Sequence, residues 1–113
     1  MSDALRLAFE SALAFRRSLA DRPVGVQATQ ASLRAALDQP LTEQGESAES
    51  VIADLVRNAD PGIVAEPGPR YFGFVIGGSS DAAVAADWLT SAWDQNAGLY
   101  ACSPALEIGR AHV

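Results

Sequence analysis

The stretch Ser47–Gly62, SAESVIADLVRNADPG, determines the fold class that the sequence predicts. Its apolar residues recur at steps of three and four, the spacing of one helix face; they are Ala48, Val51, Ile52, Leu55, Val56 and Ala59. Ser47 is a suitable N-cap, and Asp60-Pro61-Gly62 ends the pattern because proline and glycine do not continue a helix. The stretch therefore predicts an amphipathic helix.

The same spacing predicts helices on both sides of this stretch. Residues 3–20 carry an apolar stripe that ends at Asp21-Arg22-Pro23, since the residue before proline leaves the helical region; the stripe consists of Leu5, Ala8, Phe9, Ala12, Leu13 and Leu19. A shorter helix starts at Thr29 or Gln30 and is closed by Pro40.

A fourth predicted helix begins at Ser80 or Asp81 and includes Trp88 and Trp93 in its stripe. It is apolar all round, which favours burial on more than one side. Ser103-Pro104-Ala105 is typical of a further helix start, with serine as the cap and proline at the first helical position.

Residues 70–76, RYFGFVI, are rich in aromatic and β-branched side chains and follow three prolines. This composition predicts a short extended or β segment. The predicted fold class is mainly α, with four to five helices and one short extended segment near residues 70–76. A length of 113 residues favours one domain.

Composition excludes several classes of function. The formal net charge is -6 and no arginines cluster, so no basic face is available for nucleic acid or an anionic membrane. A single cysteine cannot form an internal disulfide, and charges interrupt the N-terminal apolar stretch, so we expect a cytoplasmic protein. The chain contains no lysine, which excludes Schiff-base and P-loop chemistry within it.

Individual motifs give weak chemical signals. Gly77-Gly78-Ser79-Ser80 at a helix start resembles a phosphate cradle, but it lacks the GxGxxG spacing and the P-loop lysine, so a simple cap is the better interpretation. Asp81, Asp87 and Asp94 are better read as solvated or capping acids than as a catalytic pair. Cys102 is better read as a small core residue than as a nucleophile.

The aromatic segment Pro69–Gly78 has two interpretations that its pattern leaves open. A proline-anchored aromatic strand beside two glycines suits the wall of a ligand pocket, because glycine lets a ligand approach the backbone. Core packing explains the same residues equally well.

Several segments, in order, resemble a known family. GPRYFGFVIGGS (68–79), AADWLTSAWDQNAGLY (85–100) and CSPA (102–105) are similar to the N-terminal part of the group II pyridoxal-phosphate-dependent decarboxylases, which act on aromatic amino acids, glutamate and related substrates. RPVGV (22–26) and ESVIADLVRNADPGIV (49–64) resemble the bacterial members. The resemblance covers nearly all of residues 1–106.

This resemblance implies a fold, a cofactor and a partner. The fold is the N-terminal fragment of an α/β type I transferase fold, with residues 1–62 as a helical dimerisation segment and residues 63–107 as the start of the large domain that binds pyridoxal 5'-phosphate (PLP). The full-length protein is expected to be a homodimeric PLP-dependent carboxy-lyase of amino acid metabolism, with an amino acid as substrate.

The resemblance also implies site residues. Phe74, Val75, Ile76 and Gly77 match the segment that lines the substrate side of the active site, and Asn96 and Gly98 match the stretch that reaches the site of the neighbouring subunit. The family's Schiff-base lysine and stacking histidine match no residue here, so no catalytic residue is assigned.

Departures from the family leave the substrate open. Gly68 stands where many members have histidine. Val75 and Gly98 are smaller than the corresponding residues of the aromatic-acid branch.

Residues 108–113, IGRAHV, resemble the translation of a common sequencing adapter. We expect them to be an artefact, which would also make His112 foreign to the natural protein, although a genuine tail is the alternative. The expected function is therefore a fragment of a PLP-dependent decarboxylase, inactive alone. The alternative is a small helical protein-interaction module without catalysis.

Overall fold

The structure, a computed structural model, describes residues 2–106. The predicted artefact at residues 108–113, with His112, lies outside the described residues. The described chain is mainly helical, as predicted, and divides into two compact units, with the boundary in the sequence between Gly78 and Ser79. The expected domain division at residue 62 concerns the full-length protein and stays a prediction.

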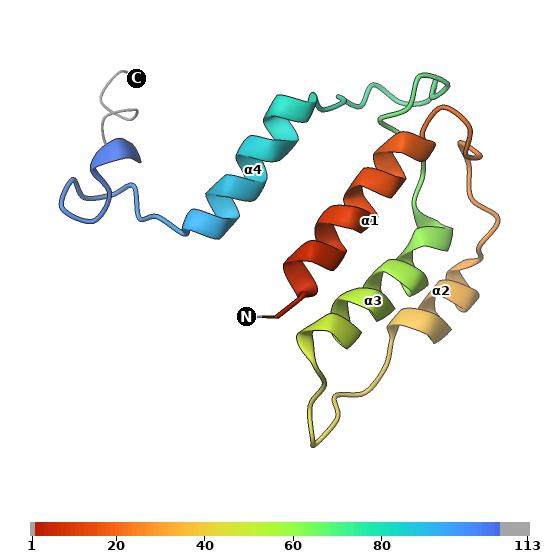
Figure 1. The fold of residues 1–113 in the computed structure, drawn as a ribbon. Helices are drawn as coiled ribbons and strands as arrows, with labels where there is room; N and C mark the ends of the chain where they lie inside the picture. The colour runs from red at the N-terminus through yellow and green to blue at the C-terminus, as the bar shows by residue number, and fades with distance from the viewer. Residues whose placement is uncertain (1, 107–113) are drawn as a thin grey trace. The chain divides into compact units, whose positions relative to one another are not determined.

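The first unit contains three α-helices, with α3 (Ala48–Ala59) between α1 (Ala4–Ser18) and α2 (Gln30–Leu37) (Figure 1). Helix α3 packs against both of the others. A 3₁₀ turn, η1 (Asp60–Gly62), continues directly from α3. The stretch that determined the predicted fold class is therefore the helix around which this unit is arranged.

The predicted helix starts are confirmed by their caps. The Ser47 Oγ accepts a hydrogen bond from the Ser50 backbone N–H at 3.1 Å. Thr29 and Ser32 form a reciprocal capping box, in which each side chain accepts from the other residue's backbone N–H at 3.0 Å. Each cap satisfies an N–H group that the helix itself leaves without an acceptor.

The most buried part of the first unit lies beyond the helix ends. Among the described hydrophobic residues, Leu19 and Ala65 are the buried ones, at 8% and 0% exposure. The Ala65 backbone N–H donates to the Val24 carbonyl oxygen at 3.1 Å, and the Gly68 N–H donates to the Ala65 carbonyl oxygen at 3.1 Å. The first bond joins the loop after α1 to the segment after η1, and the second closes a turn within that segment.

Arg22 makes further contacts at the edge of the region where the loop after α1 meets the segment after η1. Its guanidinium lies 3.1 Å from the Asp60 carboxylate and 4.8 Å from the centre of the Phe15 ring. Its carbonyl oxygen accepts a hydrogen bond from the Arg70 guanidinium. One side chain and its backbone thus connect α1, η1 and the segment that leads to residue 70.

A second connection joins the starts of α1 and α3. The Asp3 backbone N–H donates to the Glu49 Oε1 at 2.7 Å. This hydrogen bond is the main cause that holds the pKa of Glu49 below its ordinary value, and the residue's own backbone N–H at the helix start lowers that pKa further.

The expected extended segment near residues 70–76 does not form a strand. Residues 73–75 form a bend, and no strand is present in the range 2–106. A strand requires a partner strand to pair its backbone groups. None lies beside this segment in the described chain, so its aromatic and β-branched composition does not decide its conformation.

The second unit contains α4 (Asp81–Trp93). Its predicted cap is confirmed, because the Ser80 Oγ accepts from the Ala83 N–H at 3.2 Å. The helix ends at Asp94, which adopts a left-handed conformation with φ 47° and ψ 50°. Residues 104–106 are helical, which agrees with the predicted helix start.

The predicted burial of α4 is not found. All its residues are exposed apart from a half-buried Val84, and Trp93 is 59% exposed. The apolar composition of α4 predicted that other segments would pack on more than one of its sides. Within the described chain, no segments bury it in this way. No helix among the described residues has the length and apolar character needed to cross a membrane.

The close packing between the loop after α1 and the segment after η1 predicts a strong effect for Gly68→Ala. A Cβ at this position would lie 3.0 Å from the Leu19 carbonyl oxygen and 3.1 Å from that of Ala65. Backbone atoms cannot move aside as a side chain can, so we expect about 1–3 kcal/mol of destabilisation, measured by thermal unfolding followed by circular dichroism. Gly25→Ala is the control, because its Cβ would meet nothing within 4 Å. Equal melting curves for the two variants would contradict this packing.

The Glu49 contact predicts a pH dependence. Because the pKa of Glu49 is lowered in the folded chain, its contribution to stability is present above the ordinary glutamate value and is lost as the pH falls through the lowered pKa. We expect Glu49→Gln to lose part of the stability difference between neutral and acidic pH, measured by urea unfolding at a series of pH values. Glu43→Gln, in the exposed loop before α3, is the control and should keep that difference. An unchanged pH profile in Glu49→Gln would exclude the contact.

Candidate functional site

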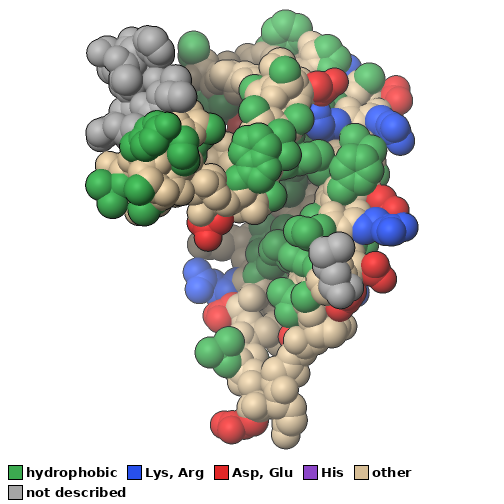
Figure 2. All heavy atoms as spheres, turned by 60° about the vertical axis from the view of Figure 1, so that its left-hand side comes forward, with side chains coloured by type: hydrophobic (Ala, Val, Ile, Leu, Met, Phe, Trp, Pro, Cys, Tyr) green, Lys and Arg blue, Asp and Glu red, His purple; other side chains and the backbone are tan. Residues whose placement is uncertain are grey.

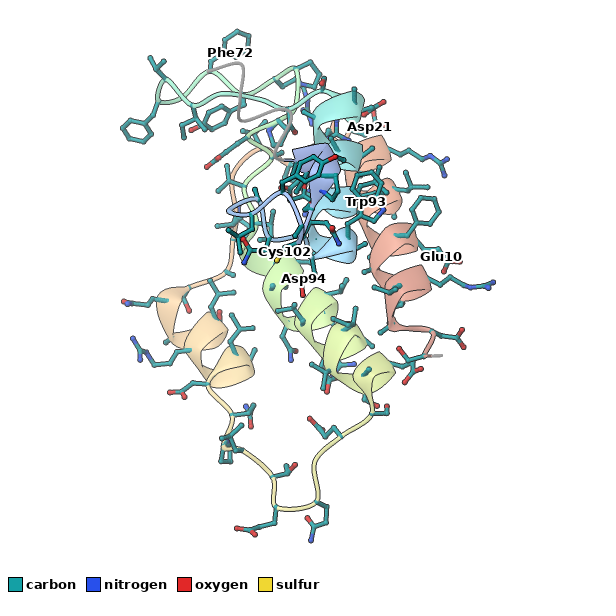
Figure 3. All side chains as sticks on the ribbon, turned by 90° about the vertical axis from the view of Figure 1, so that its left-hand side faces the viewer. Glu10, Asp21, Phe72, Trp93, Asp94 and Cys102 are labelled. Atoms are coloured by element: carbon teal, nitrogen blue, oxygen red, sulfur yellow. The ribbon has the colours of Figure 1, made fainter. Side chains whose placement is uncertain are left out.

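The four residues expected to line a substrate pocket are exposed in the structure. Phe74 is 86% exposed, Val75 107% and Ile76 45%, while a Cβ at Gly77 would meet nothing within 4 Å. Figure 3 shows the neighbouring Phe72 on the same loop, pointing away from α1, α2 and α3. Of the two open interpretations, core packing within the described chain is therefore excluded.

Tyr71 and Gly73 explain how this segment turns its aromatic side chains outward. A Cβ at Gly73 would lie 2.6 Å from the Tyr71 hydroxyl oxygen, so the tyrosine ring lies directly against the Gly73 backbone and would have to shift for a larger residue. Tyr71 is half-buried, whereas Phe72 and Phe74 project into solvent. The bend presents a short apolar surface without a charged side chain between Tyr71 and Ser80.

Asn96 and Gly98, the residues expected to reach a partner subunit, lie together in one turn. The Asn96 Oδ1 accepts a hydrogen bond from the Gly98 backbone N–H at 2.8 Å. A Cβ at Gly98 would lie 3.1 Å from that oxygen, so the glycine allows the turn to close tightly. This turn belongs to the second unit and the Phe74–Gly77 segment to the first, so each is described by itself.

The weaker chemical motifs gain no support as sites. The Ser80 side chain acts as the cap of α4, which is the interpretation preferred for Gly77-Gly78-Ser79-Ser80. Cys102 is a free thiol and is exposed, so its expected role as a core residue is wrong. Within residues 2–106, no group of three or more His, Cys, Asp or Glu side chains could hold a metal ion.

The described residues do not fit PLP by themselves. They include neither a lysine to bond the cofactor nor a histidine to stack on its ring. The Ser80 hydroxyl, which could otherwise face a phosphate group, accepts the capping hydrogen bond of α4. The chemistry of such a cofactor therefore cannot be assigned to these side chains.

A groove between α1 and α3 is a feature that the sequence interpretation missed. It has a volume of about 360 Å³ and an almost wholly apolar lining. The lining includes Ala8, Ala12 and Phe15 of α1, Ile52, Leu55, Val56 and Ala59 of α3, and Ile63. The signal in the sequence was the two apolar stripes themselves, because Ala8 and Ala12 of the first and Ile52, Leu55, Val56 and Ala59 of the second line this groove.

Comparison with known proteins finds no family model that matches the chain and no curated protein that matches it. The family resemblance of the sequence segments therefore stays a prediction.

The exposure of Phe74 predicts that its removal does not affect folding. We expect Phe74→Ala to change the unfolding free energy by less than about 0.5 kcal/mol, because an exposed side chain leaves no cavity. Phe15→Ala is the comparison, since Phe15 lines the α1–α3 groove and lies under Arg22; it should lower the melting temperature. A loss for Phe74→Ala as large as that for Phe15→Ala would show that Phe74 is a core residue.

Proposed function

We propose that this chain is the N-terminal part of a PLP-dependent amino acid decarboxylase, a cytoplasmic carboxy-lyase that acts as a homodimer. In this proposal the chain supplies part of the substrate-pocket wall and contacts between subunits, and it is inactive alone. The support is the ordered resemblance of several segments, together with one structural observation.

That observation is the amount of apolar surface left open. Among the described hydrophobic residues, the buried ones are Leu19 and Ala65, while large side chains on every helix are exposed. Figure 2 shows hydrophobic side chains, in green, at many places on the visible surface. Soluble chains rarely leave extensive apolar surface open, so it favours a role in which further protein covers these helices.

The proposal gives each exposed segment a task. Phe74, Val75, Ile76 and Gly77 would contact the amino acid substrate. The wall they form has no charge, and Gly77 leaves its backbone accessible to a ligand. Asn96 and Gly98 would present their hydrogen-bonded turn to the neighbouring subunit. Residues that hold PLP would come from other parts of the full-length protein, because the described residues do not fit it.

A second candidate function is a helical protein-interaction module. The observation that favours it is the α1–α3 groove, whose apolar lining suits the apolar face of a partner helix. In this case the exposed helices would be covered by another protein, and no cofactor would be involved.

The genomic sequence downstream of Pro104 separates the two functions. We expect the reading frame to continue at length and to encode a histidine and, further on, a lysine in a PLP-binding context. A stop codon soon after Pro104 would contradict the decarboxylase proposal and favour the interaction module. Purified protein from the long frame should bind PLP, with the absorbance of the bound cofactor as the readout.

Steady-state kinetics of that full-length protein test the site residues. We expect Phe74→Ala to raise KM for the amino acid about tenfold, equivalent to about 1.4 kcal/mol of lost binding, because the side chain forms the pocket wall. Phe72→Ala is a matched control, being an equally exposed phenylalanine two residues away that is not assigned to the wall. Equal KM values for the two variants would show that Phe74 does not line the substrate site. That result would contradict the site assignment but not the proposed decarboxylase activity.

A further inference from the structure

We draw no further inference here: the strongest candidate, the apolar groove between α1 and α3 lined by Phe15, Ile52 and Val56, carries nothing because no feature of the described chain shows what covers it.

Discussion

Arg22 connects three segments of the first unit that are far apart in the sequence. Its guanidinium pairs with Asp60 and lies over the Phe15 ring, while its carbonyl oxygen receives the Arg70 side chain. Arg22 is half-buried and Asp60 exposed, and an ion pair this close to the surface contributes only about 0–1 kcal/mol, with a cation–π contact contributing about as much. Their importance is geometric, because they hold the loop after α1 against the segment after η1, where Leu19 and Ala65 are buried. That closure lies at the end of α1 and the end of α3, while the Asp3–Glu49 hydrogen bond joins the starts of the same two helices.

Local features of the fold were predictable because local chemistry determines them. Ser47 and Ser80 cap the helices at the expected positions, since a hydroxyl three residues before a free N–H satisfies it wherever the chain goes next. Features that need a distant partner were not predictable. Residues 73–75 form a bend where an extended segment was expected, and no strand of the described chain pairs with them. The exposure of α4 was not predictable, because hydrophobic composition does not specify which surface covers a helix.

The candidate site follows the same division. The sequence pointed to Phe74, Val75, Ile76 and Gly77 through resemblance, and in the described chain these residues are exposed rather than packed in a core. The α1–α3 groove was missed because helical periodicity identifies an apolar face but does not say how much of it one neighbour covers.

Gly68 shows where the structure bears on the family resemblance. It departs from the histidine of many members of the resembled family, and a Cβ there would lie only 3.0 and 3.1 Å from the Leu19 and Ala65 carbonyl oxygens, a tighter approach than most Cβ atoms make.

The position of the two tryptophans has a practical consequence for spectroscopy. Trp88 and Trp93 are the chain's only tryptophans, and both lie on α4 in the second unit. Intrinsic tryptophan emission therefore reports on the surroundings of α4 and gives no direct signal from the helices that precede Gly78. Because both indole rings are partly open to water, at 39% and 59% exposure, their emission maximum will move to shorter wavelength when another surface covers them. The same two residues thus act as a built-in optical probe for whatever protein surface α4 packs against.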